Sequence, residues 1–158
     1  MRKRILIIIV SFIVILAQIN CKTSSEEDSG ISVIYYLIGE VSPNHMDSYI
    51  LPLSDPNDIT TADNIISGIS RNRIVVATIG YGSGDGVYMN KDLTGSGNRI
   101  WSWHILKFEN FADVTAEIYD GWPGYLEDNL SNWLATKSGI IGFWNYTVKR
   151  RVDIAELQ

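Results

Sequence analysis

The chain has 158 residues, a net charge of −5 at pH 7 and a single cysteine, Cys21. Without the N-terminal cations Arg2, Lys3 and Arg4, 10 basic residues face 18 acidic ones, a net charge of −8. An acidic surface disfavours nucleic acid and electrostatic docking on anionic lipid. One cysteine excludes an intramolecular disulfide, and with only two histidines beside it we expect no zinc site and no other cofactor.

The N-terminus has the layout of a secretory signal. Three cations precede an apolar stretch at residues 5–17, which is shorter than the roughly 20 residues of a membrane-spanning helix. A cut immediately before Cys21 resembles bacterial lipoprotein processing, in which the cysteine becomes the lipidated N-terminus. Gln18 and Asn20 depart from the usual processing box and are similar to the looser boxes of spirochaete lipoproteins. The alternative is an uncleaved N-terminal anchor.

We therefore divide the chain into three parts. Residues 1–20 are predicted to be a lipoprotein-type signal peptide, and residues 21–30 an acidic, flexible tether. Residues 31–158 have the length of one domain that can bury a sizeable core. Acylation of Cys21, for instance with palmitate, would hold this domain in the bacterial cell envelope, at the outer membrane, the cell surface or the periplasmic face.

Five elements are expected in the first half of the domain. Residues 31–41 are β-branched and aromatic without a helical period, which predicts a buried strand. Residues 47–54 predict an edge or irregular strand, because the proline within them cannot donate to a ladder. Residues 55–68 predict a short helix that starts with Asp-Pro and ends at a glycine. Residues 73–81 predict a strand, and the glycine-rich residues 82–98 predict a long hairpin loop.

Four more elements complete the domain. Residues 99–108 and 112–120 alternate as strands do, and residues 139–152 predict a last strand. Residues 121–136 predict a helix, since their apolar residues recur at the three-and-four spacing of one buried face. Strands and helices do not alternate regularly along the chain. We therefore predict an α+β fold with a mainly antiparallel β-sheet and about two helices packed on one side.

Several separated motifs occur in an order that resembles a known family. They are Leu53, Asp55 and Pro56; Ile66, Ser67 and Gly68; Trp101, Ser102, Trp103 and His104; Tyr125, Leu126, Glu127 and Asp128; and Trp144 with Arg150 and Val152. The chain is similar to a family of small exported domains named after the N-terminal domain of a calmodulin-binding protein. The resemblance implies a secreted single domain and no particular reaction, and the calmodulin link belongs to one full-length protein.

The chain also departs from that family pattern. Many relatives have Leu-Asp-Pro after the histidine, where this chain has Ile105, Leu106 and Lys107. Many relatives also carry cysteines near the second helix, where Tyr119 stands here, and in the last strand. Any disulfide that those relatives form is therefore excluded in this chain.

The Trp-Ser-Trp-His stretch at 101–104 is the sharpest candidate binding motif. Strand alternation places Trp101 and Trp103 on one face, and Ser102 and His104 on the other. The two tryptophans suit stacking on sugar rings or anchoring a protein partner, and they equally suit packing as core under the helix of residues 121–136. His104 beside Ser102 suits either acid–base work or a structural role.

The glycine-rich stretch at 80–86 is similar to a phosphate-binding loop only at first sight. It lacks the G-x-G-x-x-G spacing and is followed by no Walker lysine. It predicts a mobile hairpin in which Tyr81, Asp85 and Tyr88 are candidate ligand contacts, because loops on rigid scaffolds often carry binding function. The basic residues 149–151 are expected to form local ion pairs in so acidic a domain.

These features predict a membrane-anchored surface or periplasmic lipoprotein whose domain binds a macromolecule without catalysis. The expected partners are the lipid bilayer, through acylated Cys21, and a protein or carbohydrate ligand, but no nucleic acid. Two alternatives stay open: a secreted hydrolase that uses His104, and an inhibitor of a secreted hydrolase that acts through residues 80–98. An exposed Trp101 or Trp103 beside the loop would favour binding, and a cleft holding His104 with a carboxylate would favour the enzyme.

Overall fold

A computed structural model describes residues 32–71, 73–95, 98–114 and 121–158. Its first sheet consists of β1 (Ile34–Glu40), β2 (Ser48–Leu53) and β6 (Tyr146–Val152), all antiparallel and in the order β2-β1-β6. β1 is the central strand, and every residue of it after the first is buried. Burial on both faces explains why residues 31–41 show no alternation of apolar and polar side chains.

The second sheet has the order β4-β3-β5 and consists of β3 (Ile74–Tyr81), β4 (Trp103–Ala112) and β5 (Ile140–Ile141). β3 and β4 form the antiparallel hairpin that the glycine-rich loop predicts. The register shifts twice along β4, where Leu106 and Glu109 are each an extra residue between two paired positions of β3. Such β-bulges bend a strand and change the direction in which a side chain points.

The first helix, α1 (Pro56–Ile66), begins as the sequence predicts. The Asp55 carboxylate accepts hydrogen bonds from the backbone N–H of Asn57 at 2.8 Å and of Asp58 at 3.3 Å. Proline at the first helical position loses no backbone hydrogen bond there. Gly68 follows the helix with a φ of +73°, a left-handed conformation that favours glycine.

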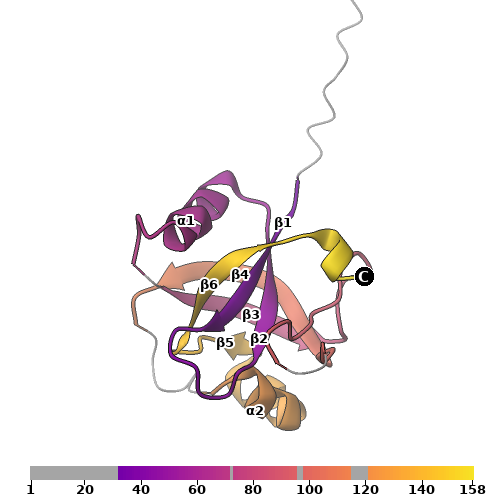
Figure 1. The fold of residues 1–158 in the computed structure, drawn as a ribbon. Helices are drawn as coiled ribbons and strands as arrows, with labels where there is room; N and C mark the ends of the chain where they lie inside the picture. Colours follow the sequence, from indigo (N-terminus) through magenta and orange to yellow (C-terminus); the bar gives the residue numbers. More distant parts are fainter. Residues whose placement is uncertain (1–31, 72, 96–97, 115–120) are drawn as a thin grey trace, which may run out of the picture.

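The helix predicted at 121–136 is divided into α2 (Pro123–Asp128) and α3 (Leu130–Lys137). The break falls at Asn129, whose side-chain amide donates to the Tyr125 carbonyl at 2.9 Å and so competes with the helical backbone pattern. A short 3-10 helix, η2 (Ile154–Glu156), follows β6. Figure 1 shows α1 and α2 at opposite ends of the molecule, with the sheets between them.

One large apolar core lies between the two sheets and receives side chains from both sheets and from all three α-helices. Trp101 and Trp103 are its largest fully buried side chains. The other face of the first sheet carries a smaller apolar cluster around Tyr35, which Tyr88 of the glycine-rich loop and Leu157 close. The loop therefore packs against the fold as well as joining two strands.

The α+β class with antiparallel pairing is confirmed, and the strands form two sheets. The strand predicted at 112–120 falls largely on residues 115–120, outside the described residues, and Ala112 ends β4. Residues 139–152 contain two strands, because a turn at Trp144 separates β5 from β6. Within the described ranges, no helix is long and apolar enough to cross a membrane.

Candidate functional site

The turn between β1 and β2 is built around one buried carboxylate, that of Glu40. Its oxygens accept backbone N–H groups from Asn44 at 2.6 Å, His45 at 3.0 Å and Met46 at 3.0 Å. Burial alone would raise the pKa of Glu40, but these hydrogen bonds outweigh it and lower the pKa to about 2. They also hold Met46 at a φ of +57°, which is uncommon for a residue other than glycine.

His45 is fixed in this turn by both ring nitrogens and by one ring face. Nδ1 lies 2.9 Å from a Glu40 carboxylate oxygen and therefore donates to it, which leaves Nε2 to accept from the Asn44 side-chain amide at 3.2 Å. The imidazole stacks on the Trp122 indole, with ring centroids 4.1 Å apart and an angle of 7° between the planes. His45 thus joins the β1–β2 turn to the start of α2.

Asp47 is a second buried carboxylate at the end of the same turn. It accepts the Gly124 backbone N–H at 2.9 Å and a short hydrogen bond from the Tyr146 hydroxyl. Burial raises the pKa of Asp47, the two hydrogen bonds oppose this, and the nearby charges of Asp92 and Glu40 raise it further; the net direction is upward. Asp47 therefore takes up a proton more readily than an ordinary aspartate.

Asp92, a third buried carboxylate, comes from the glycine-rich loop. Its Oδ1 accepts from the Ser48 hydroxyl at 2.8 Å and from the backbone N–H groups of Thr94 and Gly95, each at 3.0 Å. The Trp101 indole N–H donates to the Ser48 carbonyl at 2.8 Å. These bonds attach the loop to the first residue of β2 and place Asp92 on the same side of the domain as Asp47.

His45, Asp47 and Asp92 line a cavity of about 570 Å³, here called the turn pocket. Its lining residues are His45, Met46, Asp47, Asp92, Thr94, Gly95, Arg99, Trp101, Trp122 and Gly124. The guanidinium of Arg99 lies 4.7 Å from the Trp101 ring centroid, in cation–π contact. The turn pocket therefore combines carboxylate acceptors, a guanidinium donor and aromatic surface, and its volume suits a small organic group.

The turn pocket has no arrangement suited to a metal ion. In the part of the chain that the structure describes, no group of three or more histidine, cysteine, aspartate or glutamate side chains is placed to hold one. The carboxylates of Glu40 and Asp47 are instead engaged by backbone N–H groups and by the Tyr146 hydroxyl. The chemistry available is hydrogen bonding and aromatic contact.

The two tryptophans singled out in the sequence lie in the core. The exposed fraction is 1% for Trp101 and 0% for Trp103, and their rings stack on each other with centroids 6.0 Å apart. Neither indole offers a free face to a ligand, although Trp101 borders the turn pocket. His104 is also buried, and its Nδ1 lies 2.9 Å from the Gly82 carbonyl, where it fixes the loop without a carboxylate partner.

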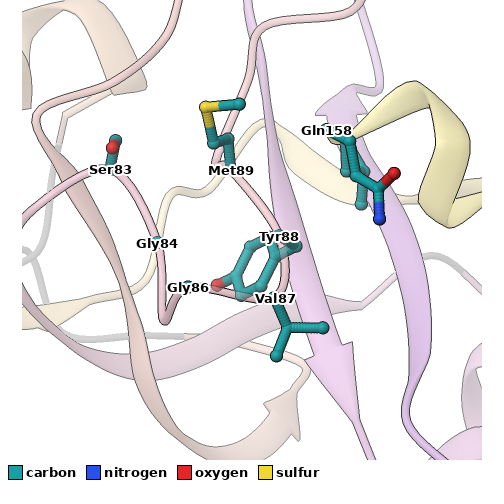
Figure 2. Close-up of a pocket in the computed structure, with 8 residues that line it drawn as sticks. Ser83, Gly84, Gly86, Val87, Tyr88, Met89 and Gln158 are labelled. Carbon is teal, nitrogen blue, oxygen red and sulfur yellow. The ribbon is translucent and has the colours of Figure 1, made fainter.

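Of the three candidate contacts of the glycine-rich stretch, Tyr81 and Asp85 are exposed and Tyr88 is buried. Tyr81 is 62% exposed, and its hydroxyl donates to the Ser131 hydroxyl at 3.1 Å. Asp85 closes its own turn by accepting the backbone N–H of Val87 at 2.8 Å. Tyr88 is buried against Tyr35, with ring centroids 5.1 Å apart, and Figure 2 shows it near Gly86 among the residues that line a pocket at the loop. None of these three lines the turn pocket.

The fold and the turn pocket define a small antiparallel α+β domain with a ligand-sized cavity. Residues 35–155 match the BP-74 N-terminal domain, and the chain belongs to that family. Neither a curated protein nor a solved structure matches the chain.

Proposed function

We propose that the chain is a lipid-anchored protein of the cell envelope whose domain binds a macromolecule without catalysis, and that the ligand contacts the turn pocket. The observation that carries the binding part is the lining of that cavity. Asp47 and Asp92 supply hydrogen-bond acceptors, while Arg99 supplies the donors, because the Thr94 hydroxyl already donates to Asp92 at 3.1 Å. The hydroxyl groups of a carbohydrate both donate and accept, so a carbohydrate chain is the ligand class that uses both the carboxylates and the guanidinium.

Binding is favoured over catalysis because the acid–base groups are already committed to internal bonds. Both ring nitrogens of His45 have partners within the turn, and the carboxylates of Glu40 and Asp47 hold the turn and α2 in place. His104, the candidate for the hydrolase alternative, bonds to the Gly82 carbonyl. A general base needs a lone pair within reach of the substrate. Internal bonds engage His45 and the two carboxylates, and His104 is buried at 8% exposure, which keeps its second ring nitrogen, Nε2, away from a substrate.

The anchor is supported by the sequence, which places one cysteine directly after a short apolar stretch. The test is labelling with palmitate in the native cell, comparing the parent chain with Cys21→Ser. The parent should carry label and the variant none, whereas equal labelling would refute the anchor. Protease treatment of intact cells then shows whether the domain faces the outside.

The binding part is tested separately, with the full chain in nonionic micelles applied to a glycan array. The apparent affinity for bound glycans should fall by about tenfold or more when Arg99→Ala removes the guanidinium donor of the turn pocket. Arg71→Ala is the matched control, because Arg71 is exposed and pairs with Asp113 away from the pocket. Absence of any bound glycan, or equal binding by Arg99→Ala and Arg71→Ala, would contradict the proposal.

A further inference from the structure

The edge strands of the two sheets lie along a common seam. β2 is an outer strand of the first sheet and β4 an outer strand of the second. At one point the fully buried Asn90 side chain joins them: it accepts the Ile50 N–H of β2 at 2.8 Å and donates to the Trp103 carbonyl of β4 at 2.9 Å. The glycine-rich loop thus closes this part of the seam with its own side chain.

Further along both strands the seam is open. A hollow of about 410 Å³, here called the edge groove, lies between Pro52 and Leu53 of β2 and Leu106 and Phe108 of β4. Asp85 also lines the edge groove. The glycine-rich loop, which closes the seam at Asn90, therefore reaches the border of the edge groove as well. The edge groove and the turn pocket share no lining residue.

The wall of the edge groove formed by β4 is apolar and turned outward. Leu106 is the extra residue of a β-bulge, since Ile79 of β3 pairs with Ile105 while the preceding residue pairs with Lys107. The bulge leaves Leu106 61% exposed, a large exposure for a leucine in a strand. Bulges next to binding sites serve to redirect a side chain in this way.

The rim of the edge groove is acidic. Asp55, Asp58 and Asp85 line it, and none of the ion pairs found within the described residues includes any of the three. The cation of the lining, Lys107, is held by Glu109 at 2.6 Å. Burial raises the pKa of Asp58, and the neighbouring charge of Asp55 raises it further, so a positive charge placed here would relieve repulsion.

We propose that the edge groove is the docking site of an extended, basic segment of a partner protein. Such a segment can lie along the open strand edge, with apolar side chains on Leu106 and lysine or arginine side chains at the acidic rim. The chain's own tether does not fit, because residues 22–30 hold three acidic residues and one lysine. A second copy fits poorly, because its basic strand residues Arg150 and Arg151 are already paired with Glu156 and Asp63.

The inference is independent of the proposed carbohydrate ligand and is tested with defined peptides. Two fluorescent pools of about eight residues each are used, one alternating lysine or arginine with apolar residues and the other alternating glutamate or aspartate with them. Fluorescence anisotropy measures binding to the full chain in nonionic micelles. The basic pool should bind, the acidic pool should not, and added salt should weaken the binding.

Two variants locate the binding. The triple variant Asp55→Asn, Asp58→Asn and Asp85→Asn removes the rim charges, while the asparagine side chains keep the turn and capping hydrogen bonds. It should weaken binding of the basic pool by roughly tenfold. Leu106→Lys should weaken binding to a similar degree, whereas Ile69→Lys, at another exposed apolar residue, should not.

Three results would overturn the proposal: no binding of the basic pool, binding that survives both variants, or equal binding of the acidic pool. Analytical sedimentation of the full chain tests whether a second copy of the chain, instead of a partner protein, fills the edge groove. A dimer that dissociates in Leu106→Lys would show that a second copy fills the edge groove, against the proposed basic partner.

Discussion

Replacing Glu40 by glutamine should remove one of the strongest local stabilising features of the domain. The pKa of this carboxyl falls from an ordinary value of 4.5 to about 2 in the fold, because backbone N–H groups of the β1–β2 turn outweigh the effect of burial. Its side chain is only 3% exposed, so solvent screens these bonds little. At about 1.4 kcal/mol for each pKa unit, the ionised carboxylate contributes about 3 kcal/mol to the free energy of unfolding near neutral pH.

The sign of the pH dependence follows from the lowered pKa. The contribution is fully present above pH 4.5, the value of the unfolded chain, and is lost as the pH falls through about 2. Glu40→Gln should therefore lower the free energy of unfolding by about 3 kcal/mol near pH 7 and by much less near pH 2. Above pH 4.5, the difference in the free energy of unfolding between the parent chain and Glu40→Gln should stay constant.

The measurement is urea unfolding of the full chain in nonionic micelles, followed by tryptophan fluorescence at several pH values. Asp128→Asn, at an exposed carboxylate on α2, is the control and should unfold like the parent chain. The reasoning is refuted if the difference between Glu40→Gln and the parent is the same at neutral and at acid pH. A loss of equal size in the control would refute it too.

Three further substitutions test other features of the fold. Asn90→Leu should lower the free energy of unfolding by roughly 2–4 kcal/mol in urea and speed hydrogen exchange at Ile50, because the β2 amide and a β4 carbonyl both lose their buried partner. Gly84→Ala should expose the glycine-rich loop to limited proteolysis, since the added carbon would overlap the Tyr88 carbonyl oxygen. Asp55→Ala should cost about 1 kcal/mol in thermal unfolding, and Asp55→Asn much less, because only the first removes the α1 cap.

Most of the fold follows from local patterns in the sequence. β2, α1 and β3 lie within two residues of their predicted limits, and β1 within three, because their signals are punctuated by proline and glycine. The division of the second helix at Asn129 was missed, since its apolar spacing continues through the break and only the asparagine side chain interrupts it. β4 begins later than predicted, at Trp103, because the backbones of Arg99 and Trp101 pair with Asp92 and Asn90 of the loop. The Trp101 indole also donates to Ser48 of β2.

The turn pocket was not predicted, for a physical reason. Glu40, His45 and Asp47 interact across a turn through backbone N–H groups and stacking, which leave no periodic signal in the sequence. Asp92 reaches them only through the folded loop. The one available signal was a glutamate at a strand end followed by a Ser-Pro-Asn-His turn. Strand alternation did place Trp101 and Trp103 together, but both point into the core.

The expectation for the basic residues at 149–151 was met in part. Arg150 pairs with Glu156, and Arg151 pairs with Asp63, so two of these cations are neutralised within the domain. Lys149 instead lines the small hollow beside Glu40. Charge balance in an acidic chain is enough to predict such pairing, although not its geometry.

The central place of β1 has a mechanical consequence. β1 is the first strand of the domain and is hydrogen-bonded on both sides, to β2 and to β6. Suppose that force is applied to the chain before Ile34 while a bound partner holds the rest of the domain. The force then acts along β1 and shears its hydrogen-bond ladders with β2 and β6 at the same time. Many hydrogen bonds must then fail together, whereas a strand pulled sideways from a sheet edge peels off one bond at a time. The anchor proposed at Cys21 would therefore load the domain through a strand that is hydrogen-bonded on both sides.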